Sequence, residues 1–220
     1  MSSPARTRPA DAAILDATER LLRERPFADL SVGDIIDAAG VSRTSFYAHF
    51  PTRSAMLAAC LRRVVDELVH AVEPFLSEAV DDPEAAIRTS LERWVGLATA
   101  HGPLLRTASE EWPHDPELRA LWFDVMGTFS RPVARVIEAA RAAGSAPPGA
   151  DPEALAACLM WGCERVLHVA LVGGALGLED PAAIVAPLAQ MMAAGVFAQP
   201  RPGADIEPPP GGFAAPRPRA

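Results

Sequence analysis

The segment Ser31–Phe50 (SVGDIIDAAGVSRTSFYAHF) carries side chains suited to binding nucleic acid. Its second half combines hydroxyl, guanidinium, phenol and imidazole groups, which bond to phosphate oxygens and to base edges. Phe46 and Phe50 are four residues apart, so they would anchor one face of a short helix and leave its polar face exposed. The side chains expected on that exposed face are Arg43, Thr44, Ser45, Tyr47 and His49.

Helix signals around this segment predict the elements that position it. Ser31-Val-Gly-Asp34 is a capping-box variant that opens a helix, and Gly40 ends that helix. Ser42 opens a short second helix after the turn, and an earlier helix would pack across both. This order is a helix-turn-helix, and a plain helical hairpin with a polar outer face is the alternative. The helices expected here run over about 10–25, 31–40, 42–49 and 52–72.

Four Asp-Pro pairs mark helix starts in the rest of the chain. An aspartate at the N-cap accepts from free first-turn amides, and proline at the next position lacks an amide that would go unused there. Apolar residues at helical spacing follow each pair, and no stretch alternates as a strand would, so we predict an all-α fold. The pairs are Asp82-Pro83, Asp115-Pro116, Asp151-Pro152 and Asp180-Pro181. The further helices are expected at about 83–100, 103–110, 116–142, 152–172 and 181–197.

The charge of the chain is unevenly distributed. The 220 residues have a formal net charge of −8, but residues 1–65 contain nine Arg and seven acidic residues, whereas residues 66–220 contain eleven Arg and twenty-one acidic residues. A balance of +2 on the head and −10 on the body indicates a polyanion partner for the N-terminal part. The difference is small and supports the motif only as a secondary observation.

Composition also suggests a compartment and a domain plan. Three cysteines without regular spacing argue against a disulfide framework, and the first residues lack the apolar run of a secretory signal, so we expect a cytoplasmic protein. The uncharged stretch from 181 to 200 is interrupted by Pro187, which favours a buried or interface helix over a membrane span. The expected divisions are a disordered arm (1–9), a helix-turn-helix domain (10–52), a helical domain (53–198) and a disordered Pro/Gly-rich tail (199–220).

The string AAGVSRTSFYAHFPTRSAML resembles the DNA-binding segment of TetR-family transcriptional repressors, and the likeness extends over about residues 12–60. More weakly, ERPFADLSVGDI, ALWFDVM and CERVLHVALVGG resemble the ethionamide-type regulators of that family. The resemblance implies a dimeric repressor that binds palindromic operator DNA and is released by a small apolar ligand held in the C-terminal domain. It implies neither the operator sequence nor the regulated gene.

Carried over by position, the resemblance assigns DNA contacts to the head. Ser42 would cap the recognition helix, whose exposed residues would face the major groove and its phosphates. Thr52 and Arg53 occupy positions of backbone contacts, and Ser31 would add a hydroxyl or amide contact. The homodimer interface would form from the helices at about 152–172 and 181–197, whose small residues allow close approach. Those small residues are Ala154, Ala157, Gly162, Ala182, Ala186, Ala189 and Ala193.

The candidate ligand-binding residues lie in the body. One helical stripe contains Trp122, Met126, Phe129 and Val133, and ordinary core packing would also explain it. All four tryptophans of the chain, however, lie between 94 and 161, as expected for an apolar cavity wall. Ethionamide-type regulators have polar amide side chains at the middle of their ligand tunnel, and Met160 and Cys163 replace them here. The polar part of a ligand would therefore be bound differently. The positions implied by the resemblance are Trp94, Trp122, Met126, Phe129, Val133, Met160, Cys163, His168 and Met192.

Other arrangements in the sequence carry little chemistry. The histidines show no metal-ligand spacing, and Cys158 and Cys163 are about 140° apart around a helix, so we expect no metal and no cofactor. Gly173-Gly174-Ala-Leu-Gly177 ends a helix and does not follow a strand, unlike a dinucleotide fingerprint. A helical enzyme with a small-molecule pocket and an interaction module without DNA binding are the other function classes, and we expect that the chain is not an enzyme.

Overall fold

The computed structural model describes residues 9–76 and 82–197, and within these ranges the chain is helical and contains no strand. The expected disordered arm and tail lie, apart from Pro9, outside the described residues. The elements are α1 (Ala10–Leu22), η1 (Phe27–Asp29), α2 (Val32–Ala39), α3 (Arg43–His49), α4 (Arg53–Leu76), α5 (Pro83–Ala100), α6 (Gly102–Glu111), α7 (Pro116–Ala142), α8 (Pro152–Leu171), η2 (Pro181–Ile184) and α9 (Val185–Phe197).

All four Asp-Pro helix starts are confirmed. The aspartate carboxylates at 82, 115, 151 and 180 accept hydrogen bonds of 2.8–3.0 Å from amides two or three residues onward. The last pair opens a 3₁₀ turn, and the α-helix begins only at Val185. An α-helix from Pro181 would require an amide from Pro187, whereas a start at Val185 puts Pro187 in the first turn, where no amide is needed.

The first helix is shorter than expected. α1 ends at Leu22, and the amides of Glu24 and Arg25 close the end by donating to the Leu21 carbonyl at 3.0 Å. Arg25 precedes Pro26, and a residue before proline is disfavoured in the α conformation, so the helix stops before it.

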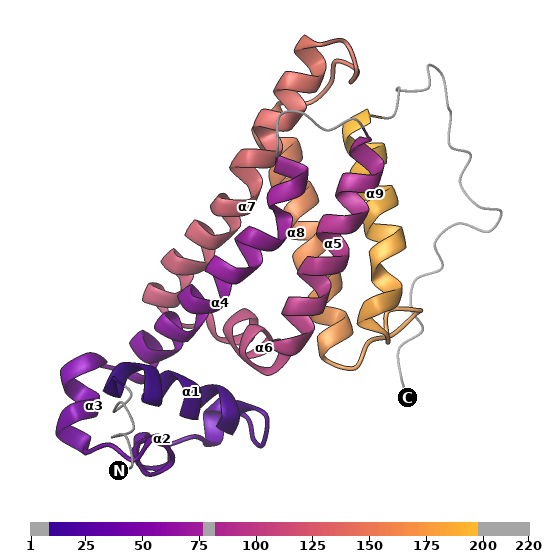
Figure 1. The fold of residues 1–220 in the computed structure, drawn as a ribbon. Helices are drawn as coiled ribbons and strands as arrows, with labels where there is room; N and C mark the ends of the chain where they lie inside the picture. The colour runs from indigo at the N-terminus through magenta and orange to yellow at the C-terminus, as the bar shows by residue number, and fades with distance from the viewer. Residues whose placement is uncertain (1–8, 77–81, 198–220) are drawn as a thin grey trace, which may run out of the picture.

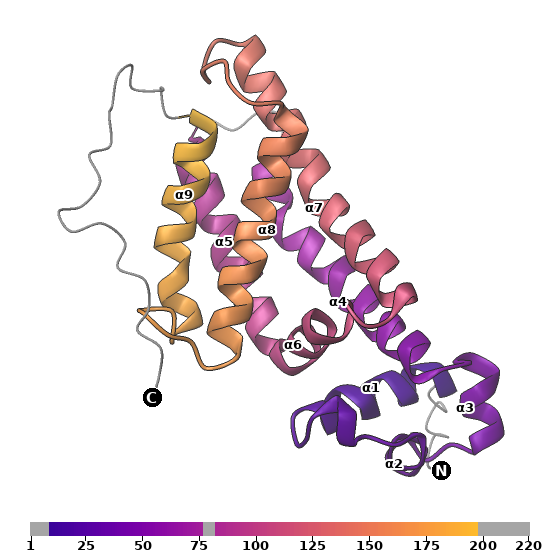
Figure 2. The same cartoon turned by 180° about the vertical axis from the view of Figure 1, so that it is seen from behind.

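The elements form a small head and a larger helical body (Figure 1). In the head, α1 packs against α2 and α3, and α4 leads from the head into the body. In the body, α4 packs against α5 and α7, α7 against α8, and α5 against α9. The short helix α6 lies at the end of the body nearest the head and contacts α1, as the view from behind also shows (Figure 2). A change in the position of α4 or α6 would therefore reach the head directly.

Helix α8 is the one described helix that is long and apolar enough, by length and composition alone, to cross a membrane. In this fold it packs against α6, α7 and α9, as a core helix of a bundle does. Only 28% of its most apolar window is buried within the subunit. Most of its other apolar residues are half-buried, and Ala154 and Cys158 are exposed.

Candidate functional site

The inner face of α3 is fixed by aromatic packing. Phe46 is fully buried and Phe50 is buried, and their ring centroids lie 6.0 Å apart. The turn before α3 depends on Gly40, whose φ of 67° ends α2 in the left-handed conformation that glycine adopts without strain. Helix α3 is therefore held against the head core in one orientation.

The outer face of α3 carries the expected polar side chains. Arg43, Thr44, Tyr47 and His49 are exposed, and Ser45 is half-buried. The Tyr47 side chain is 46% exposed although its ring lies edge-on to Phe46, with the centroids 5.4 Å apart. The structure thus brings together, on one exposed face, four of the five side chains that the sequence places there.

Three hydroxyls proposed as DNA contacts act as helix caps. The Ser42 and Thr52 oxygens accept from the amides of Ser45 and Ala55, which leaves each O–H free to donate to a phosphate oxygen. Ser31 differs because its hydroxyl donates to the Asp34 carboxylate and also accepts from the Asp34 amide. Its backbone amide also donates to Asp34 Oδ2 at 2.8 Å, so both donors of Ser31 are committed to the capping box in this structure.

The same capping box has a strong electrostatic effect. Hydrogen bonds from the Ser31 hydroxyl and then from Arg25 hold the pKa of the Asp34 carboxyl well below its usual range. Arg25 lies 2.8 Å from the carboxylate. Asp34 stays ionised at every pH of physiological interest, so the start of α2 does not titrate there.

Arg53 lies in a position that the sequence does not predict. Its guanidinium donates to the Phe27 carbonyl and stacks over the Phe27 ring, with 4.3 Å between Cζ and the ring centroid. Both interactions stabilise the junction between η1 and α4. In this geometry Arg53 stabilises the head, and its Nη2 and Nε atoms are directed into the protein.

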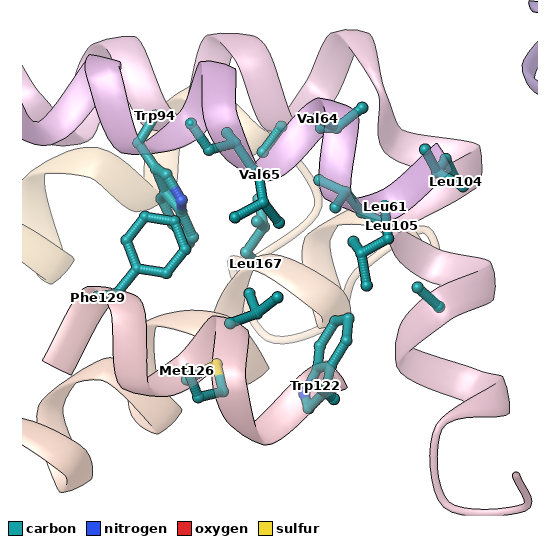
Figure 3. Close-up of a cluster of buried hydrophobic side chains, with 14 of the residues drawn as sticks. Leu61, Val64, Val65, Trp94, Leu104, Leu105, Trp122, Met126, Phe129 and Leu167 are labelled. Carbon is teal, nitrogen blue, oxygen red and sulfur yellow. The ribbon is translucent and has the colours of Figure 1, made fainter. Parts of the chain in front are cut away.

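A narrow cavity of about 60 Å³ lies in the body between α4, α5, α6, α7 and α8. Its wall is largely apolar, and Trp94, Trp122 and Phe129 approach it from facing helices (Figure 3). Sites for drug-sized ligands usually measure about 300–1,000 Å³, so such a ligand would have to push the helices apart. The wall residues are Leu61, Val65, Leu68, Trp94, Leu105, Ser109, Trp122, Val125, Met126, Phe129, Met160, Glu164, Leu167, His168 and Leu171.

Six of the nine candidate ligand-binding residues lie on this wall. The other three, Val133, Cys163 and Met192, are buried elsewhere in the bundle. Cys163 is fully enclosed, and burial raises the pKa of its thiol to about 12. The six residues on the wall are Trp94, Trp122, Met126, Phe129, Met160 and His168.

Sequence reasoning missed the contribution of α4, α6 and Glu164 to the wall. The apolar stripe on α4 could be found, but nothing in its spacing distinguishes a cavity wall from packed core. Glu164 did leave a signal: with Met160 and His168 it follows the i, i+4, i+8 spacing of one helix face. An acidic residue on a largely apolar helix face indicates a polar point in the cavity.

A polar cluster connects the head to the body beside α6. The Arg63 guanidinium on α4 binds both Asp16 and Glu19 on α1, with 2.6 Å between Nη1 and the Asp16 Oδ1. Glu19 Oε2 lies 3.1 Å from Nδ1 of His101, at the junction of α5 and α6. The other ring nitrogen of His101 lies 3.6 Å from Glu67 Oε2. We call these five residues the head–body cluster.

Two family models match the chain. Residues 14–60 match the model "Bacterial regulatory proteins, tetR family", and residues 83–198 match the model "Transcriptional regulator EthR, C-terminal domain". The second match spans more than half of the chain. This chain belongs to the TetR family. It is of the EthR type, which confirms the resemblance found in the sequence.

Curated TetR-family relatives cover most of the chain. The HTH-type transcriptional regulator EthR of Mycolicibacterium smegmatis is 32% identical over 182 residues, covering 81% of this chain and 82% of the relative. EthR of Mycobacterium tuberculosis is 33% identical over 164 residues, covering 74% of this chain and 76% of the relative. Both are regulators of transcription, and the chain is accordingly a TetR-family transcriptional regulator and not an enzyme.

Solved TetR-family structures share the fold. SmeT, the repressor of the Stenotrophomonas maltophilia multidrug efflux pump SmeDEF, is 25% identical with a TM-score of 0.68, covering 91% of this chain and 97% of SmeT. A SmeT–triclosan complex matches with the same identity and TM-score.

Within the described residues, no group of three His, Cys, Asp or Glu side chains is placed to hold a metal ion.

Proposed function

We propose that the protein is a dimeric repressor that binds palindromic operator DNA and releases it when a small apolar effector enters the body. The observation that carries this proposal is the outer face of α3, with Arg43, Thr44, Tyr47 and His49 exposed above a buried aromatic face. In a helix-turn-helix protein, such a face reads base edges in the major groove. The proposal places the protein in the cytoplasm, where operator DNA is found.

The partly covered apolar surface of α8 supports the dimer. Most apolar residues of α8 are only half-buried within the subunit, and a second copy of α8 and α9 would cover them. Ala154 is exposed and Ala157 and Gly162 are half-exposed, whereas Ala189 is buried inside the subunit and is not available to a partner. Two heads on such a dimer would meet successive major grooves, about 34–36 Å apart.

The small size of the cavity supports release by an effector. A ligand shifts a conformational equilibrium only when it prefers one conformation, and a molecule larger than about 60 Å³ prefers an expanded body. Expansion displaces α4 and α6, since Leu61, Val65 and Leu105 line the cavity. Both helices contact α1, so the two heads would move out of register with the grooves.

The proposal is tested with DNA from upstream of the protein's own gene. Fluorescence anisotropy should show saturable binding that an excess of random DNA does not abolish, with two chains bound per palindrome. Thr44→Ala and Tyr47→Ala should each weaken binding without lowering the melting temperature.

A protein that binds this DNA no more tightly than random DNA would contradict the repressor assignment. Light scattering that shows a monomer at micromolar concentration would contradict the dimer. An interaction module without DNA binding would show the first of these results.

A further inference from the structure

The polar side chains of the cavity wall, apart from the two indoles, lie on α6 and α8. Met160, Glu164 and His168 occupy one face of α8, and Ser109 on α6 approaches the same face. The remaining wall residues are apolar or aromatic. Of the fifteen wall residues that the structure describes, Glu164 is the one with a carboxyl group. A single carboxylate therefore stands in a largely apolar site.

One oxygen of this carboxylate is satisfied and the other is not. Glu164 Oε1 accepts a hydrogen bond of 2.9 Å from the Ser109 hydroxyl. Oε2 is buried and has no hydrogen-bond partner, and the Glu164 side chain is only 12% exposed. A buried carboxylate oxygen without a hydrogen bond is unfavourable, so a donor on a ligand would stabilise it.

The nearest of the protein's own cations pairs with this oxygen without a good hydrogen bond. The nearest is Arg165, whose Nη2 lies 3.5 Å from Oε2, beyond a good hydrogen bond, and whose side chain is 52% exposed. Burial, followed by the neighbouring Arg165, lowers the pKa of His168 below its ordinary value, so the imidazole is neutral near pH 7. Glu164 itself and then Glu110 oppose this shift in the pKa of His168, and Arg106 adds to it.

The aromatic residues on the wall suit the rest of such a ligand. Trp94, Trp122 and Phe129 provide flat apolar surfaces around the cavity (Figure 3). The Trp122 Nε1 atom and the His168 Nδ1 atom are also buried without hydrogen-bond partners. Aromatic faces attract cations as well as apolar groups, so they would not oppose a positive charge brought to Glu164.

We propose that the effector is a lipophilic cation, an aryl-alkyl amine in its protonated form, whose ammonium group donates to Glu164 Oε2 while its apolar part lies among the cavity aromatics. This inference rests on the proposed function, since it concerns the same cavity. Charge-assisted hydrogen bonds are about twice as strong as neutral ones, so a cation should be preferred to a neutral donor of the same shape.

The test uses three probes of one shape that differ in charge: 4-phenylbutylamine, 4-phenyl-1-butanol and 4-phenylbutyrate. Binding to the full-length dimer is followed by quenching of the tryptophan fluorescence and by calorimetry. We expect the amine to bind at least tenfold more tightly than the alcohol and the carboxylate to bind most weakly. Glu164→Gln should remove the amine preference and leave the affinity for the alcohol within about twofold.

Arg165→Gln is the complementary variant. Because it removes the cation that competes for Oε2, it should tighten binding of the amine severalfold and leave the alcohol unchanged. An amine preference that persists in Glu164→Gln would overturn the inference. Equal affinity for amine and alcohol in the wild type would overturn the inference alone, whereas absence of binding by all three probes would also contradict the effector part of the proposed function.

Discussion

The head and the body present their functional side chains in opposite ways. On α3 the side chains that would read DNA point into solvent, and the face beneath them is locked by Phe46 and Phe50. In the body, the side chains that would read an effector are buried around a cavity of about 60 Å³. Three of them, Trp122, Glu164 and His168, have buried polar atoms without hydrogen-bond partners.

This difference indicates that the head and the body bind their partners in different ways. The head is preorganised, so it loses little conformational freedom when it binds a rigid partner such as a duplex. The body has buried polar atoms without hydrogen-bond partners, and its cavity is smaller than a drug-sized ligand. A ligand can therefore be bound most favourably when the body changes shape around it. The head–body cluster, together with α4 and α6, would transmit a change in the body to the head.

The largest expected effect comes from removing the anchor of the head. Phe46→Ala deletes a fully buried ring and should lower the free energy of unfolding by about 3–5 kcal/mol. Operator binding should be lost with it, because α3 no longer has a fixed orientation. Chemical denaturation measures the loss, and Phe123→Ala, at a ring that is 53% exposed, is the control and should cost much less.

Arg53→Ala should act on stability more than on DNA. The variant loses a charge-assisted hydrogen bond to the Phe27 carbonyl and a cation–π contact, together worth about 1–3 kcal/mol of unfolding free energy. Arg43→Ala, at an exposed position, should leave stability unchanged but reduce the salt dependence of operator binding by about one counterion. The opposite pattern would mean that Arg53 leaves Phe27 to contact phosphate.

Tyr47→Ala should weaken operator binding by about 10-fold or more, within the roughly 1–3 kcal/mol of one base contact, with no change in melting temperature. The phenol is exposed, so little packing is lost. Competition between the specific site and random DNA measures the loss of discrimination. Equal weakening on both kinds of DNA would assign Tyr47 to the backbone.

The smallest expected effect concerns the head–body cluster. His101→Ala removes the contact between the α5–α6 junction and Glu19, and we expect operator affinity to fall about threefold to tenfold, in the range of a coupling free energy near 1 kcal/mol. His114→Ala, at an exposed histidine, is the matched control. An unchanged operator affinity in His101→Ala would show that the cluster does not orient the head.

Much of this arrangement could be predicted from the sequence, because it depends on local signals. The Asp-Pro caps, the Ser31 capping box and the Gly40 turn each act within a few residues, and they define the helices and the DNA-reading face. The head–body cluster could not be predicted because Glu19 and His101 are 82 residues apart and their meeting depends on packing.

The cavity was only partly predictable for a related reason. Val133 continues the stripe of Trp122 and Phe129 along α7, but the cavity ends before it, and helical spacing does not fix where a cavity ends. Arg53 shows the same limit. Its position at the start of α4 suggests a phosphate contact, while the ring that it covers, Phe27, lies in a different element.

The central claim is that a filled cavity and an operator-bound head exclude one another, and Val125→Phe tests it without an effector. Val125 lines the cavity on α7, so the larger ring should force the body toward its expanded shape; overpacking strain of about 1–3 kcal/mol corresponds to an operator affinity about 5- to 150-fold lower. Val136→Phe makes the same change on α7 away from the wall and should bind like the wild type. Anisotropy with operator DNA, on variants shown by melting and light scattering to be folded dimers, should separate the two. Wild-type affinity in a folded Val125→Phe dimer would contradict the account.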